Sequence, residues 1–154
     1  MSSSPAAAGL LSAIRSKTAK AGVIGLGYVG LPLAMSMARG GFTVTGFDID
    51  PAKTEAIDAR ESYIEAVPSA ILKGEVEAGR FAATCDFAGL AACDVIAICV
   101  PTPLTRHRDP DLSYVEKTCR QIAATLRPGQ LIVLESTTWP GTTEEVMKPI
   151  LEET

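Results

Sequence analysis

The sequence predicts an α/β fold built on a doubly wound parallel sheet within a single domain. Its apolar runs are short and continuous rather than alternating, which is typical of strands that are buried on both faces. Helix-like stretches separate these runs, and this alternation favours parallel strands joined by right-handed crossovers. We expect a strand order of 3-2-1-4-5, with strands at residues 21–25, 42–47, 95–100 and 131–134 and a weaker candidate at 80–84.

Length and composition fit one folded domain. The chain has 154 residues, enough for one sizeable core and too few for two ordinary domains. Apolar residues make up 47% and charged residues 21%, so we expect a folded chain. The net charge of −4, without a basic face, argues against a nucleic-acid partner. No stretch approaches the roughly 20 continuous apolar residues of a membrane span, so we expect no membrane partner.

The first residues of the chain predict a disordered segment, whereas the last residues predict the beginning of a helix. Residues 1–9 are small, and we expect a disordered segment there without a secretory signal. Apolar residues between 10 and 14 then indicate a short helix ending near Lys17. A helix has only just begun when the chain reaches Thr154, so we expect residues 10–154 to be the N-terminal part of something longer.

Two later helices start with the spacing of a capping box. Ser113 with Glu116, and Thr142 with Glu145, match the pattern in which the two side chains satisfy free backbone N–H groups. Apolar residues at 115, 119, 122 and 126 then form one face of a helix, which we expect to end at residues 127–129.

The cysteines show no spacing typical of a metal site or a redox pair, and only one histidine is present to join them. We therefore expect no metal and reduced thiols, as in a cytoplasmic protein. All four are expected to be small residues in or near the core: Cys85, Cys93, Cys99 and Cys119.

Gly25, Gly27 and Gly30 form a GxGxxG pattern between the first expected strand and a helix expected over residues 28–39. In this context Gly25 allows a tight turn, Gly27 lets a pyrophosphate approach the main chain, and Gly30 lets the helix lie close to the sheet. The free N–H groups of the helix start favour phosphate. The pattern predicts a Rossmann-like dinucleotide site, the alternative being a glycine-rich turn without a ligand.

Asp48 ends the second expected strand. A carboxylate there can accept both hydrogen bonds of an adenosine ribose diol and repels a 2′-phosphate, so NAD is favoured over NADP. Lys53 follows a few residues later, and it is either close to the charged part of the cofactor or a solvated helix lysine.

Two further strand ends carry polar candidates for the same edge of the sheet. Thr102 lies between two prolines, where it either donates to the cofactor or belongs to a rigid turn. Glu135 and three hydroxyl residues follow the last strand, and Glu135 is either part of a site rim or a solvated carboxylate.

A basic loop follows Thr102 in the sequence. His107 there is most simply an ordinary surface histidine. Arg106 and Arg108 either meet a phosphate or sugar carboxylate or are solvated, and we take Arg108 as the substrate candidate.

Four stretches in order resemble the UDP-glucose/GDP-mannose dehydrogenase family, the nucleotide-sugar 6-dehydrogenases. Residues 62–65 and 110–115 further resemble its UDP-N-acetylglucosamine 6-dehydrogenase branch. Trp139 stands where we expect a tyrosine, and Glu135 where the UDP-glucose enzymes tend to have lysine. The four stretches are Gly25-Leu-Gly-Tyr-Val-Gly-Leu-Pro-Leu-Ala34, Phe47-Asp-Ile-Asp50, Val100-Pro-Thr-Pro103 and Glu135-Ser-Thr-Thr-Trp-Pro-Gly-Thr-Thr143.

The resemblance implies the NAD-binding domain of an enzyme of polysaccharide biosynthesis. Such enzymes oxidise C6 of a UDP-sugar, here UDP-N-acetylglucosamine or UDP-N-acetylmannosamine, to a uronic acid with two NAD. Thr137 would also position a catalytic water, and the full-length protein would be a homo-oligomer. Besides the glycines, the implied NAD contacts are Tyr28, Val29, Asp48, Lys53, Thr102 and Thr137.

The family's nucleophilic cysteine lies further along than residue 154, in a motif that none of the four cysteines matches. By resemblance, that thiolate traps the aldehyde, and water later hydrolyses the thioester. We therefore expect this chain alone to lack catalysis. Two alternatives stay open at this point: an NAD-dependent 3-hydroxyacid-type dehydrogenase domain of the same fold, and a stand-alone NAD-binding module.

Overall fold

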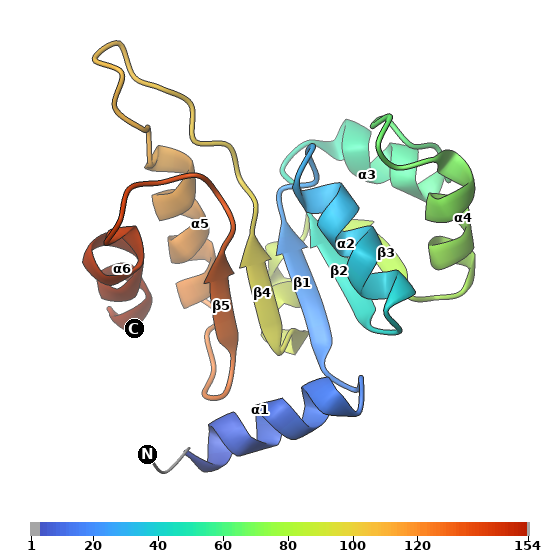
Figure 1. Ribbon diagram of the computed structural model, residues 1–154, viewed down its shortest axis with the longest axis horizontal. Helices are drawn as coiled ribbons and strands as arrows, with labels where there is room; N and C mark the ends of the chain where they lie inside the picture. Colours follow the sequence, from blue (N-terminus) through green and yellow to red (C-terminus); the bar gives the residue numbers. More distant parts are fainter. Residues whose placement is uncertain (1–3, 154) are drawn as a thin grey trace.

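A five-stranded parallel sheet forms the centre of the computed structural model, which describes residues 4–153 (Figure 1). The order β3-β2-β1-β4-β5 and the weaker strand candidate are both confirmed. The chain winds outward from β1 in one direction and from β4 in the other, and ligands bind at such a switch point in α/β sheets. The strands are β1 (Lys20–Ile24), β2 (Thr43–Phe47), β3 (Phe81–Thr84), β4 (Val95–Ile98) and β5 (Leu131–Leu134).

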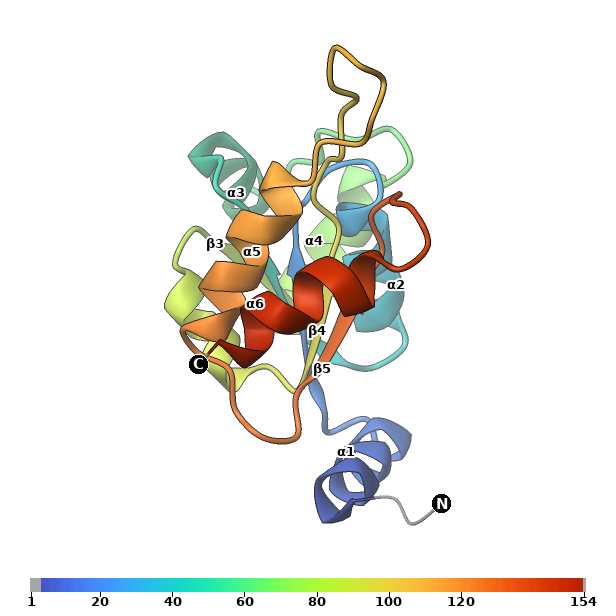
Figure 2. The ribbon, with the colours of Figure 1, turned by 90° about the vertical axis from the view of Figure 1, so that its left-hand side faces the viewer.

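Helices cover both faces of this sheet (Figures 1 and 2). One face carries α2 (Gly30–Arg39), α3 (Pro51–Asp58) and α4 (Ser69–Glu77). The other carries the 3₁₀ turn η1 (Phe87–Ala92), α5 (Ser113–Ala123), the π-helical turn η2 (Thr143–Met147) and α6 (Lys148–Glu152). No helix in the described part of the chain is long and apolar enough to cross a membrane.

Successive strand residues enter opposite halves of the core, which explains the continuous apolar runs. Val23 packs against the α2 side, and the next residue, Ile24, packs against the α5 side. Ala97 and Ile98 divide in the same way, and all four are at most 2% exposed. Each central strand therefore needs an apolar residue at nearly every position.

The N-terminal helix α1 (Pro5–Arg15) corrects the expectation for residues 1–9, because residues 5–9 are helical. The Ser4 side chain accepts the N–H of Ala7 at 3.2 Å, and Pro5 suits a first helical turn, where its missing N–H costs nothing. Residues 1–3 lie outside the described part of the chain. None of the α1 residues is buried, and α1 lies at the amino end of the sheet (Figures 1 and 2).

Both predicted capping boxes are wrong. The carboxylate of Asp111 accepts the N–H of Ser113 at 2.9 Å, so an Asx turn prepares the start of α5. The Thr142 hydroxyl donates to the Trp139 carbonyl at 2.8 Å rather than capping the following turn. The α5 helix also ends at Ala123, before the predicted stop, and α2 begins at Gly30 rather than at residue 28.

Candidate dinucleotide site at the carboxyl edge of the sheet

Gly25 and Gly30 occupy positions that only glycine fits. Gly25 has φ +90°, and a Cβ there would lie 2.7 Å from the carbonyl oxygen of Cys99. A Cβ on Gly30 would lie 1.6 Å from the carbonyl oxygen of Gly25, well inside contact distance. These two glycines let the chain leave β1 in a tight turn and let α2 begin against the sheet.

Gly27 differs, because a Cβ there would meet no atom within 4 Å. Within residues 4–153, the N–H groups of Gly27, Tyr28 and Val29 have no protein acceptor. Tyr28 is 84% exposed and Val29 is 58% exposed. Open space, unpaired N–H groups and the positive end of the α2 dipole together fit a diphosphate, so the residues present suit a dinucleotide.

Asp48 and Lys53 lie beside this loop and contact each other. Asp48 is 6% exposed, and its Oδ2 accepts the N–H of Leu26 at 2.8 Å while its Oδ1 accepts the N–H of Asp50 at 2.9 Å. The Lys53 Nζ lies 3.2 Å from Asp48 Oδ2. A carboxylate offers about four acceptor positions, so the backbone bonds leave room for a ribose diol once Lys53 moves aside.

The loops after β4 and β5 are tied together by two hydroxyl groups. The Thr102 hydroxyl donates to the Thr137 carbonyl at 2.7 Å, and the Ser136 hydroxyl donates to the Val100 carbonyl at 2.7 Å. The structure therefore brings Thr102 and Thr137 together at the carboxyl edge. Because Thr102 already donates its proton, its oxygen is available to the site as an acceptor in this arrangement.

Residues 103–111 form a hairpin arm, which we define by its internal hydrogen bonds. Leu104 and Pro110 pair in antiparallel fashion, and the N–H of Thr105 donates to the Asp109 carbonyl at 2.8 Å. Arg108 lies in the turn of this arm with φ +64° and an exposed side chain. The arm projects from the carboxyl end of the sheet, at the opposite end from α1 (Figures 1 and 2).

The tip of the arm also holds the other two basic residues of this loop. Arg106 and His107 are both exposed, and the N–H of His107 donates to the Thr105 hydroxyl at 3.2 Å. Glu135, on the neighbouring loop after β5, is exposed as well. Among the described residues, none of these three side chains makes a hydrogen bond or an ion pair to residues 25–30, which we call the glycine loop, so the alternatives drawn from the sequence for each of them stay open.

Three of the four thiols lie in surroundings that favour the protonated form. Burial raises the pKa of Cys93, Cys99 and Cys119 to about 11. Cys85 is exposed, which corrects its expected place in or near the core. It follows the last residue of β3, an edge strand, and its Sγ lies 3.7 Å from the Thr54 hydroxyl.

Sequence reasoning missed two residues of this edge. Ile49 is 73% exposed directly after Asp48, and the signal for it was an isoleucine between two aspartates at a strand end. The Tyr63 hydroxyl donates to the Leu26 carbonyl at 2.6 Å, in the middle of the glycine loop. The two residues are 37 positions apart, so no local pattern could indicate that contact.

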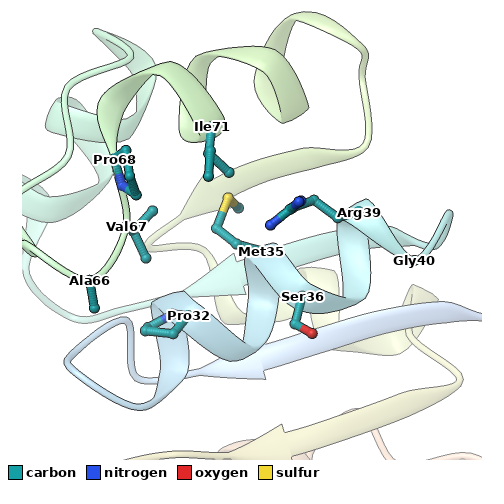
Figure 3. A pocket seen from close by; sticks show the side chains of 9 residues that line it. All are labelled: Pro32, Met35, Ser36, Arg39, Gly40, Ala66, Val67, Pro68 and Ile71. Carbon is teal, nitrogen blue, oxygen red and sulfur yellow. The ribbon is translucent and has the colours of Figure 1, made fainter.

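A separate shallow cavity of about 390 Å³ lies between α2 and α4 (Figure 3). Met35 and Arg39 of α2 point toward Ile71 of α4 there, with Val67 beside them. None of the residues predicted for the dinucleotide site lines this cavity. The candidate site is therefore the carboxyl edge and not this groove.

Comparison with known proteins gives one consistent family. Residues 19–154 match the NAD binding domain of the UDP-glucose/GDP-mannose dehydrogenase family. The chain is 40% identical to UDP-N-acetyl-D-glucosamine 6-dehydrogenase of Pseudomonas aeruginosa, over 88% of this chain and 31% of that protein. It is 39% identical to UDP-N-acetyl-D-mannosamine dehydrogenase of Pyrococcus horikoshii, over 82% of this chain and 30% of that protein.

A solved structure agrees with these relatives. The NDP-N-acetyl-D-galactosaminuronic acid dehydrogenase from Methanosarcina mazei superposes with a TM-score of 0.84 at 35% identity. That match covers 98% of this chain and 34% of the other. The chain thus spans about a third of the length of the proteins it matches.

Proposed function

Because the chain belongs to the UDP-glucose/GDP-mannose dehydrogenase family and contains its NAD-binding domain, we propose that it is the N-terminal part of a nucleotide-sugar 6-dehydrogenase. The proposed reaction oxidises the C6 hydroxyl of a UDP-sugar, UDP-N-acetylglucosamine or UDP-N-acetylmannosamine, to a uronic acid with two NAD. A 3-hydroxyacid-type dehydrogenase is disfavoured, because it would not explain why residues 19–154 match the NAD binding domain of the UDP-glucose/GDP-mannose dehydrogenase family. The observation that carries the proposal is the glycine loop, whose unpaired N–H groups open beside the Asp48 carboxylate.

The adenosine half of NAD is assigned to the end of β2. The N–H groups of Gly27, Tyr28 and Val29 would hold the diphosphate, and Asp48 would accept the ribose hydroxyls. Lys53 would leave Asp48 and turn toward the phosphate charge, which its 33% exposed side chain permits. The exposed Ile49 side chain offers an apolar surface for the adenine ring.

The nicotinamide half is assigned to the paired loops after β4 and β5. When bound, NAD supplies the hydride acceptor of the reaction. Thr102 and Thr137 would contact the cofactor from these loops, and the Thr137 hydroxyl would hold a water near the sugar. Arg108 on the hairpin arm is the proposed contact to the charged part of the substrate.

The remaining parts of the proposal concern the longer protein. Its residues 10–154 would form the NAD-binding domain, while the nucleophilic cysteine would be supplied by later residues. The three thiols with a pKa of about 11 are poor nucleophiles, which supports that division. We place the protein in the cytoplasm, as a homo-oligomer without nucleic-acid or membrane partners.

Titration calorimetry of the chain with NAD⁺ and NADP⁺ tests the cofactor assignment. NAD⁺ should bind at least tenfold more tightly, because Asp48 repels a 2′-phosphate. Equal affinities would remove the role of Asp48. The second test adds a UDP-sugar: the 154-residue chain should form no NADH, whereas the longer gene product should form two NADH per sugar. Steady NADH formation by the chain alone would contradict the assignment of the nucleophilic cysteine to later residues.

A further inference from the structure

The main chain of Leu26 is held from both sides. This residue lies between Gly25 and Gly27, and its N–H donates to Asp48 Oδ2 at 2.8 Å. Its carbonyl oxygen accepts the hydroxyl of Tyr63 at 2.6 Å. Leu26 is 0% exposed, so water cannot replace either partner. The two peptide groups on either side of the Leu26 Cα are thereby fixed, the first by a carboxylate on its N–H and the second by a phenol on its carbonyl oxygen.

Tyr63 is itself held in place by the segment between α3 and α4. The N–H of Ser62 donates to the Ser69 hydroxyl at 3.0 Å, which clips this segment to the start of α4. The neighbouring Ile64 is 4% exposed and packs in the core with Val67. The ring therefore reaches the glycine loop from a rigid base rather than from a flexible loop.

The hydroxyl of Tyr63 keeps its proton throughout the working range of pH. Burial is the main cause that raises its pKa above the usual value, and the charges of Asp48 and Asp50 add to the effect. Ionisation beside two carboxylates is unfavourable, so the group can act only as a donor toward Leu26. The bond to the carbonyl is consequently insensitive to pH near neutrality.

We propose that Tyr63 is a positioning residue for cofactor binding, which acts through the Leu26 carbonyl to aim the N–H groups of residues 27–29 at the diphosphate. This inference rests on the proposed function, since it assumes that NAD binds at the glycine loop. If Tyr63 had only a structural role, its removal would destabilise the whole domain and weaken the binding of all ligands alike. A positioning role instead predicts a loss that is specific to ligands with a diphosphate.

The test compares Tyr63→Phe with the original chain and with Tyr114→Phe, a matched control on α5, which covers the other face of the sheet. Calorimetry measures the affinity for NAD⁺ and for adenosine, which lacks phosphates. We expect about tenfold weaker NAD⁺ binding in Tyr63→Phe, less than about twofold change for adenosine, and no change in Tyr114→Phe.

Amide hydrogen exchange by NMR gives a second readout. Exchange at Gly25 and Leu26, whose N–H groups donate to the Phe47 carbonyl and to Asp48, should accelerate in Tyr63→Phe, while the core strands keep their protection. Unchanged NAD⁺ affinity would overturn the inference, and so would equal losses for NAD⁺ and adenosine with faster exchange everywhere. If the original chain fails to bind NAD⁺, the proposed function itself fails, which is distinct from either result.

Discussion

The two ends of the parallel sheet use their polar groups in opposite ways. At the amino end, the Asp94 carboxylate accepts the N–H of Lys20 at 2.8 Å and the Arg127 guanidinium at 2.7 Å. Gln130 donates to the Cys93 carbonyl at 2.7 Å. The bonds from Lys20 and Arg127 hold the pKa of Asp94 below its usual value. This end is closed by hydrogen bonds within the protein.

The carboxyl end leaves donors and apolar side chains open instead. Among residues 4–153, no protein acceptor faces the N–H groups of residues 27–29, and Tyr28 and Ile49 are 84% and 73% exposed. Unpaired N–H groups at the start of α2 are tolerated because a ligand or water can satisfy them. Polar groups at the amino end therefore stabilise the fold, whereas the free N–H groups at the carboxyl end remain available to a ligand.

Gly30→Ala is the substitution expected to have the largest effect, a loss of stability. Its new Cβ would lie 1.6 Å from the Gly25 carbonyl oxygen, and main-chain atoms cannot move aside cheaply. We expect a loss of about 3 kcal/mol or more in the free energy of unfolding. Thermal denaturation followed by circular dichroism measures it. A variant as stable as the original chain would refute the close contact between α2 and β1.

Gly27→Ala is the matched substitution in the same loop, with the opposite expected result. No atom lies within 4 Å of its new Cβ, so stability should change by less than about 1 kcal/mol. The methyl group would occupy the space assigned to the diphosphate, and NAD⁺ should bind at least tenfold more weakly by calorimetry. Full NAD⁺ affinity in this variant would move the cofactor away from the loop.

Asp94→Asn tests the amino end. It removes the charge opposite Arg127 and should lower the free energy of unfolding by about 1 kcal/mol at neutral pH, without changing NAD⁺ affinity. The folded pKa of Asp94 is lowered, so its contribution is complete above the ordinary carboxyl value near 4 and is lost as pH falls through the folded value.

Urea unfolding at several pH values measures this dependence. The stability difference between the original chain and Asp94→Asn should shrink as pH falls from about 7 to about 3. A difference that stays constant over this range, or weaker NAD⁺ binding in the variant, would contradict the separate roles of the two ends.

Arg108→Ala has the smallest expected effect. Its side chain is exposed on the hairpin arm, so stability should change by less than about 0.5 kcal/mol and NAD⁺ affinity should stay the same. In the longer protein, the KM for the nucleotide sugar should rise while Arg15→Ala, an exposed arginine on α1, leaves it unchanged. An unchanged KM in Arg108→Ala would retire its assignment to the substrate.

The sheet was predictable because its signals are local. Continuous apolar runs identify strands buried on both faces, and crossover rules then restrict their order to very few possibilities. The roles of Gly25 and Gly30 were predictable for the same reason, because a tight turn and a closely packed helix require glycine at a fixed spacing between a strand and a helix. The weaker strand candidate at residues 80–84 corresponds to the edge strand β3 (Phe81–Thr84).

What the sequence could not show depends on contacts between distant residues. Asp48 was predicted to accept the ribose hydroxyls, and the structure adds that it accepts the N–H of Leu26, 22 positions earlier. The hydrogen bond from Tyr63 to Leu26 corresponds to no periodic pattern in the sequence. The capping boxes failed because other acceptors take their N–H groups: Asp111 accepts the N–H of Ser113, and the Gly141 carbonyl accepts the N–H of Glu145 at 2.9 Å, which depends on the path of each loop.

The most direct measurement is the NMR shift map of the isotope-labelled chain during titration with NAD⁺. We predict the largest amide shifts at residues 25–30 and 48–50, smaller ones near Thr102 and Thr137, and none at residues 91–94 and 127–130. Shifts concentrated at the amino end, or along the cavity between α2 and α4, would contradict the assignment of the cofactor to the carboxyl edge.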